Sequence, residues 1–209
     1  MSEFVEQFER DVAKHVMEVI RDDGVHRHIR FRRPGTMCMH FDLLTWPGYL
    51  CYTGDMGTYV FRRLTDMFEF FRRSDDDRRY RIDLRYWAEK VEAADGCDGV
   101  ERFSADRFRA DVKDYFECHT DDAEVWPAQR KADLWAEIES DVLSEMDDIG
   151  EHGAWSALFH FSHDGFLFQD WERQCREYTH RFQWCCHALA WAINVYDHAR
   201  VADELERAK

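Results

Sequence analysis

Histidine, cysteine and aspartate side chains gather in the first part of the chain, where they could meet on one face of a sheet and bind a metal ion. They are His26, His28, Cys38, His40 and Asp42. Zinc needs four such ligands that converge as a tetrahedron, and the usual CxxC and HExxH spacings do not occur in the sequence. Because a single His-x-His pair arises often by chance, we expect no bound metal.

Nucleophilic catalysis and phosphate binding have no recognisable pattern in the sequence either. Cysteines and histidines are present, but nothing sets a Cys, a His and a carboxylate in a known order. The segment TGDMGTY, residues 53–59, lacks both a P-loop lysine and GxGxxG spacing, so it is typical of a hairpin turn. We therefore predict no catalytic residues, no enzymatic activity and no cofactor. A small metal- or nucleotide-binding protein that uses the same histidines and Asp42 remains an alternative.

A basic cluster stands out in an otherwise acidic chain, because four arginines occur within residues 27–33. If this segment forms a strand, alternate side chains share one face. That face would carry His28, Arg30 and Arg32. It could bind nucleic-acid phosphates, and this is our alternative hypothesis for function. The competing interpretation is that the arginines pair with carboxylates on neighbouring strands, such as Glu18 and Asp42.

Acidic residues dominate the second part of the chain. The net charge is −15, of which residues 1–95 contribute −2 and residues 96–209 contribute −13. Spacings of three and four along a predicted helix over residues 128–149 would place several carboxylates on one face. The candidate partner-binding residues on this face are Glu137, Asp141, Glu145 and Asp148. Such a stripe could imitate the phosphate rows of a duplex and occupy a nucleic-acid-binding protein, and the alternative is a solvated helix surface.

The elements that would position these residues predict an α+β fold. Apolar spacing predicts a first helix around residues 4–12, and alternation with turn signals predicts an antiparallel meander of four or five strands over 15–63. A helix over 66–73 should pack on the apolar face of this sheet. The sequence then predicts a polar hinge at 74–79 and a mostly helical half, with helices over 84–95, 105–119, 128–149, 153–161, 168–177 and 181–208.

These elements divide into an N-terminal part, residues 1–73, and a helical half, residues 80–209, which we expect to pack together as one compact unit. The helix over 181–208 is apolar around most of its circumference, which is typical of a buried helix. We expect it at the centre of the helical half, or alternatively in a homodimer interface. No apolar run is long enough to span a membrane, and the N-terminal residues do not resemble a secretory signal. We therefore expect a cytoplasmic protein with reduced cysteines.

Four segments resemble a family of small proteins of unknown function that tailed phages and prophages of Gram-negative bacteria carry. They are FERDV, IRDDGVHRHIRFRRPG, the aromatic and glycine-rich FDLLTWPGYLCYTGDMGTYVFRRL with the following DMFEFFR, and RFQWCCHALAWAI. The resemblance covers nearly the whole chain and implies a viral accessory protein that acts in the bacterial cytoplasm. It implies no catalytic residues. Our leading hypothesis is a non-catalytic protein that binds and inhibits a host defence or nucleic-acid-processing complex, as anti-CRISPR and anti-restriction proteins do.

Overall fold

The computed structural model describes residues 3–72, 82–96 and 99–207, and the predicted hinge at 74–79 lies outside them. The chain forms two compact units. Unit 1 comprises residues 1–101 and 178–209, and unit 2 comprises residues 102–177. The chain leaves and re-enters unit 1 through β7 (Glu101–Phe103) and β10 (Arg176–Tyr178), which pair as a two-stranded sheet.

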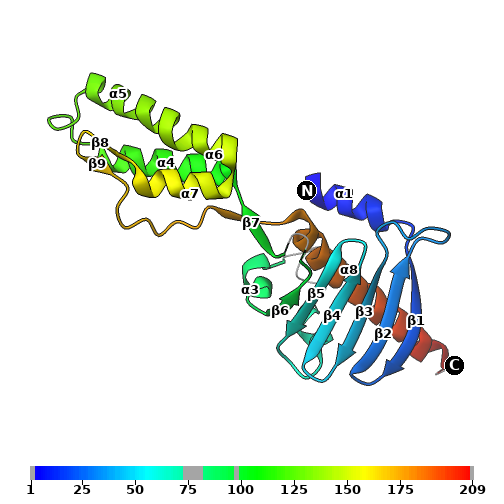
Figure 1. Cartoon of the computed structure of the whole chain (residues 1–209). Coiled ribbons are helices and arrows are strands. Elements are labelled where there is room, and N and C mark those ends of the chain that lie inside the picture. Colours follow the sequence, from blue (N-terminus) through cyan, green and yellow to red (C-terminus); the bar gives the residue numbers. More distant parts are fainter. Residues whose placement is uncertain (1–2, 73–81, 97–98, 208–209) are drawn as a thin grey trace. The chain divides into compact units, whose positions relative to one another are not determined.

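Unit 1 is built on a six-stranded antiparallel sheet with the strands in sequence order (Figure 1). The strands are β1 (Val16–Asp23), β2 (His26–Arg32), β3 (Phe41–Trp46), β4 (Tyr49–Gly54), β5 (Gly57–Arg62) and β6 (Val91–Ala94). Period-two alternation is clearest in β2, β4 and β5. Ile29 and Phe31 of β2, for example, are buried, whereas the intervening Arg30 is partly exposed. The α+β fold and the predicted meander over 15–63 are confirmed.

Helices cover one face of this sheet. They are α1 (Glu3–Val12), α2 (Met67–Phe71) and α8 (His180–Arg207), and α3 (Leu84–Ala88) precedes β6. Buried residues of the sheet, α1, α2 and α8 form one apolar core, in which the indole of Trp184 on α8 also donates a hydrogen bond to Asp11 at 3.1 Å. Figure 1 shows α8 running behind the sheet from β5 towards β1.

The predicted location of the last helix is wrong. The helix is buried as expected, but α8 packs in the core of the sheet unit and not at the centre of the helical half. The physical reason is area, because the inward side chains of the sheet offer a broad apolar surface that the five-residue α2 is too short to cover. The division into units therefore differs from the expected 1–73 and 80–209, since the chain returns to unit 1 at residue 178.

Two other predicted helices also require correction. Within residues 84–95, the helix ends at Ala88, and residues 91–94 form β6. Pairing with β5 decides this, because the Asp95 amide donates a hydrogen bond to the backbone oxygen of Thr58 at 2.9 Å. The Asp95 carboxylate in turn accepts a hydrogen bond from the Thr58 amide at 2.7 Å. Residues 168–177 are not helical either, and end in the short strand β10.

Unit 2 is a helical unit with its own apolar core. Its elements are α4 (Ala105–His119), α5 (Ala128–Ile138), the π-helical turn η1 (Glu139–Leu143), α6 (Ser144–Ile149), α7 (Glu151–His160) and a small hairpin of β8 (Ser162–His163) and β9 (Phe166–Leu167). α5, η1 and α6 follow one another without a break, as the predicted helix over 128–149 requires. We refer to these three segments together as the long helix.

Candidate functional site

The long helix separates apolar and acidic side chains. Its buried positions recur at spacing four, at Leu134, Ile138, Val142 and Met146. This spacing places them on one side of the helix, facing the core of unit 2. Residues 132–149 otherwise hold seven Asp and Glu and no Lys or Arg. The charged side chains on the exposed side of this part of the helix are therefore all acidic.

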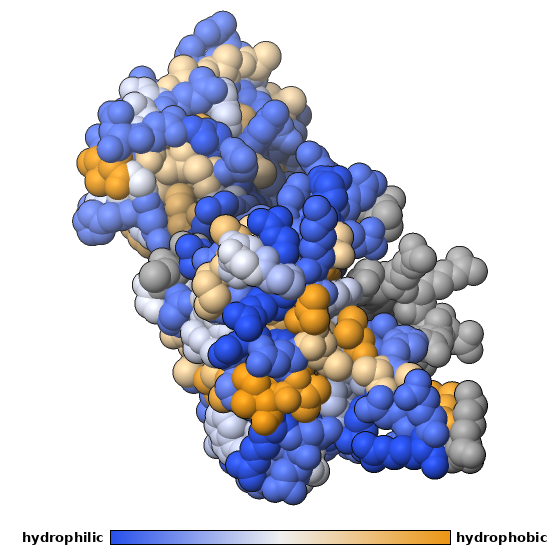
Figure 2. Space-filling view, turned by 90° about the vertical axis from the view of Figure 1, so that its right-hand side faces the viewer, coloured by the Kyte–Doolittle hydropathy of each residue, from blue (hydrophilic) through white to orange (hydrophobic). Residues whose placement is uncertain are grey.

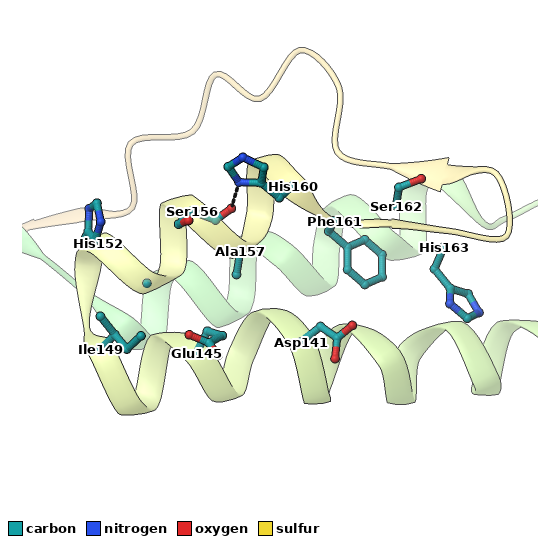
Figure 3. Close-up of a pocket in the computed structure, with 11 residues that line it drawn as sticks. Asp141, Glu145, Ile149, His152, Ser156, Ala157, His160, Phe161, Ser162 and His163 are labelled. Carbon is teal, nitrogen blue, oxygen red and sulfur yellow. Dashed lines mark hydrogen bonds between the residues drawn. The ribbon is translucent and has the colours of Figure 1, made fainter.

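A groove of about 490 Å³ lies between the long helix and α7. Figure 3 shows Asp141 and Glu145 on the long helix, with α7 opposite them. The polar side chains that line this acidic groove are Asp141, Glu145, His152, Ser156, His160, Ser162 and His163. Asp141 belongs to η1, and single π-helical turns within α-helices occur frequently at functional sites.

Two glycines set the geometry of the groove. Gly150 has a φ of 78°, a backbone conformation that glycine adopts without strain, and it lets the chain turn between α6 and α7. Gly153 lets the two helices approach closely. A Cβ atom at this position would lie 2.5 Å from the backbone oxygen of Glu145 and 2.7 Å from the Cβ of Ile149. The width of the groove therefore depends on the absence of a side chain at Gly153.

The four candidate acidic residues are all exposed, but the groove does not contain all of them. Asp141 and Glu145 line it, whereas Glu137 and Asp148 lie on the long helix outside it. Within the described ranges, none of the four forms an ion pair with a basic side chain, in contrast to the neighbouring Asp147, which is paired with Arg109. Uncompensated carboxylates of this kind are suited to accept hydrogen bonds from Lys or Arg of another molecule.

The histidines of the groove were missed by the sequence analysis. His152, Ser156 and His160 recur at spacing four on α7, which is the signal that could have identified them. The Nδ1 atom of His160 lies 2.7 Å from the backbone oxygen of Ser156. No group of three or more His, Cys, Asp or Glu in the described part of the chain is arranged to hold a metal ion. The acidic groove therefore offers polar and charged contacts to a ligand.

The basic strand is neutralised by its neighbours, as the competing interpretation of the sequence predicted. On β2 the Nε and Nη2 atoms of Arg30 donate hydrogen bonds to the two carboxylate oxygens of Asp42 on β3, at 2.8 and 2.9 Å. The Nε2 atom of His28 lies 2.7 Å from the same carboxylate. Arg32 pairs with Glu18 on β1 at 3.4 Å. The candidate nucleic-acid face thus holds its own counter-charges.

Electrostatics at Asp42 agrees with this geometry. Burial raises the pKa of Asp42, but hydrogen bonds from Arg30 and His28 outweigh burial and leave the pKa below its ordinary value. The carboxylate is therefore ionised at neutral pH and holds both side chains. The other candidate metal ligands do not join them, since Cys38 is an exposed free thiol and the Nδ1 atom of His40 lies 2.7 Å from the backbone oxygen of Met37.

Arg27 differs from Arg30 and Arg32 because its guanidinium group donates hydrogen bonds to the residue that caps a helix. The sequence did not indicate this contact. Its side chain is 9% exposed and forms two hydrogen bonds with the carboxylate of Asp66, at 2.8 and 2.9 Å. The guanidinium group also lies 4.6 Å from the ring centroid of Phe68. Asp66 in turn caps α2 through the Phe68 amide. Arg27 therefore joins β2 to α2 in the core of unit 1.

Comparisons with known proteins identify no relative, since no protein-family model, no curated protein and no solved structure matches the chain. Among the helices that the structure describes, none combines the length and the apolar character needed to cross a bilayer.

Proposed function

We propose that this protein is a non-catalytic binding protein, and that its acidic groove and the adjoining exposed carboxylates of the long helix bind a basic surface of a partner protein or ribonucleoprotein complex. The observation that supports this most directly is the set of exposed carboxylates at Glu137, Asp141, Glu145 and Asp148, none of which has a basic partner among the described residues. Like charges held side by side on a rigid helix repel one another, and an approaching row of Lys or Arg would relieve that repulsion.

The distribution of charge between the units supports the same surface. Residues 102–177 hold 8 Lys and Arg against 19 Asp and Glu, a net charge of −11, whereas the remainder holds 20 against 24, a net charge of −4. A concentrated negative field steers basic partners towards the surface that bears it and repels nucleic acid. The association rate should therefore fall as salt is added.

The resemblance to phage and prophage proteins suggests what the partner is. A viral accessory protein in the bacterial cytoplasm would bind a host complex, and complexes that process nucleic acid expose the basic surfaces that the acidic groove requires. We therefore propose a host defence or nucleic-acid-processing complex as the target, with inhibition as the consequence of binding. In this proposal the carboxylates of the long helix occupy the place of nucleic-acid phosphates.

The alternative hypothesis, binding of nucleic acid through His28, Arg30 and Arg32, has less support. All three side chains contact carboxylates of adjacent strands. Binding phosphates would require these contacts to break, and Asp42 would then lose its hydrogen bonds. The two hypotheses predict different responses to nuclease and to mutation, so one experiment separates them.

The experiment is a pull-down from bacterial lysate with tagged wild-type protein, with and without nuclease, followed by mass spectrometry. The test variant reverses three charges on the long helix, as Glu137→Lys, Asp141→Lys and Glu145→Lys. The control variant makes the same change in net charge at Glu117, Asp121 and Glu124, which are exposed acidic residues of unit 2 outside the groove.

We expect a stoichiometric protein partner that survives nuclease, is lost with the test variant and is retained with the control. Circular dichroism must show that both variants fold. Capture that persists with the test variant would contradict the assignment to the acidic groove. Capture of nucleic acid alone, lost on nuclease treatment, would instead support the basic strand.

A further inference from the structure

The two edges of the six-stranded sheet differ in a way that suggests a second binding surface on unit 1. β6 is only four residues long, and short edge strands are one means by which proteins avoid unwanted pairing. β1 is eight residues long and exposed at seven positions, and among the described strands it pairs with β2 alone. Three of those positions are large apolar residues: Val16 is 55% exposed, Val19 48% and Ile20 46%.

The end of α8 also carries exposed apolar residues, and it lies near β1. Arg200 of α8 donates a hydrogen bond to Asp22 of β1 at 2.7 Å. The last two turns of α8, which follow Arg200, therefore start next to β1. Val201 and Leu205, four residues apart and therefore on one side of α8, are also exposed. Figure 2 views the molecule from the side on which β1 lies in Figure 1, and it shows apolar side chains gathered on that face among charged ones.

A bulge in β1 brings an acidic and a basic side chain to the same face of the sheet. Glu18 lies opposite Arg30 and Arg21 lies opposite His28, two residues that share the outer face of β2, whereas Ile20 has no opposite residue. Strict alternation would place Glu18 and Arg21 on opposite faces of the sheet, and the extra residue brings both to the outer face. Residues 18–21 therefore have one acidic and one basic side chain on the same face, with Val19 and Ile20 between them.

We propose that β1 is a dimerisation strand, and that two copies of this chain pair through it in antiparallel orientation about a two-fold axis between Val19 and Ile20. This register sets Glu18 of each copy opposite Arg21 of the other, and Val19 opposite Ile20. The dimer thus forms two complementary ion pairs and covers the exposed apolar residues, while the free backbone groups of both edges pair. The present contacts of both residues permit this. The ion pairs of Arg21 with Asp23 and of Glu18 with Arg32 are both exposed and contribute little.

Charge exchange between Glu18 and Arg21 tests the register. The variant Glu18→Arg places two like-charged pairs in the interface, and so does Arg21→Glu, while the double variant restores complementary pairs in the exchanged sense. Sedimentation and light scattering over a range of concentrations would measure the dissociation constant. We expect a dimer for the wild type, weakening by about tenfold in each single variant, and recovery in the double variant.

Apolar variants test the location of the interface. Val19→Lys should abolish the dimer, whereas the control Met37→Lys, at an exposed methionine outside β1, should leave it intact. A wild type that is monomeric at about 100 µM would overturn the proposal. So would a dimer that survives Val19→Lys, or a double variant that is as weak as the single ones. Because the acidic groove belongs to unit 2, these results are independent of those from the pull-down.

Discussion

Replacing Gly153 with alanine tests whether close helix packing creates the acidic groove. The added methyl group would lie 2.5 Å from the backbone oxygen of Glu145 and 2.7 Å from the Cβ of Ile149. Neither atom is the end of a flexible side chain, so the clash cannot be relieved by a rotamer change. α6 and α7 would have to move apart, and the groove would change shape.

Two opposing contributions decide the magnitude of this effect. Alanine is favoured over glycine within a helix by about 1 kcal/mol, and forcing an extra carbon into a packed site costs about 1–3 kcal/mol. Because the atoms that Gly153→Ala would meet belong to the backbone and to a Cβ, we place the packing cost in the upper part of this range. The net result should be a loss of about 1–2 kcal/mol in the free energy of unfolding of unit 2.

Urea unfolding and amide hydrogen exchange of α6 and α7 would measure the change. The control is Gly96→Ala, because Gly96 has open space around it and no positive φ. That variant should be neutral or slightly stabilising. If Gly153→Ala instead stabilises the protein by about 1 kcal/mol, helix propensity acts alone, and α6 and α7 do not pack as closely as described.

Two further predictions concern unit 1. Burial lowers the pKa of His187 in the folded protein from 6.5 to about 4. Between pH 7 and pH 5 the unfolded chain therefore takes up a proton at His187 that the folded protein does not. The free energy of unfolding should fall by about 2 kcal/mol over this range. Urea unfolding at both pH values should show this loss in the wild type and in the control His198→Gln but not in His187→Gln, and an equal loss in all three would contradict the assignment. Arg27→Leu should cost about 2–3 kcal/mol, because it removes two charge-assisted hydrogen bonds from Asp66, whose side chain is only 20% exposed. Arg32→Leu, at an ion pair whose side chains are 45% and 51% exposed, should change stability by less than about 1 kcal/mol. Similar losses in the two variants would refute the distinction.

Local patterns made the sheet predictable. Alternation placed Ile29 and Phe31 on one face and His28 and Arg30 on the other, and it also placed Asp42 where it could pair with Arg30. The same patterns could not predict residues 91–94, because a short segment of helix-forming residues became a strand through pairing with β5. Nor could they assign α8, since a helix that is apolar on most sides fits any large core.

The groove could not be predicted from the sequence, because it depends on how two helices pack against each other. Spacing along one helix was enough to place Asp141 and Glu145 on the same face, but it could not show that only these two of the four candidates face α7. That depends on the close approach at Gly153, which cannot be inferred from an isolated glycine in a helix. The free edge of β1 and the bulge at Ile20 also depend on strand order, which alternation within one strand does not contain.

The central claim is that the acidic groove binds a basic partner, and the most direct test is an affinity measurement. The protein captured in the pull-down would be titrated with wild type, with the double variant Asp141→Lys and Glu145→Lys, and with the control Asp121→Lys and Glu124→Lys, at low and at physiological salt. We predict that affinity falls at least about tenfold in the groove variant, stays within about twofold in the control, and declines with salt in the wild type. Equal affinity of all three proteins, or binding that salt does not weaken, would contradict the account.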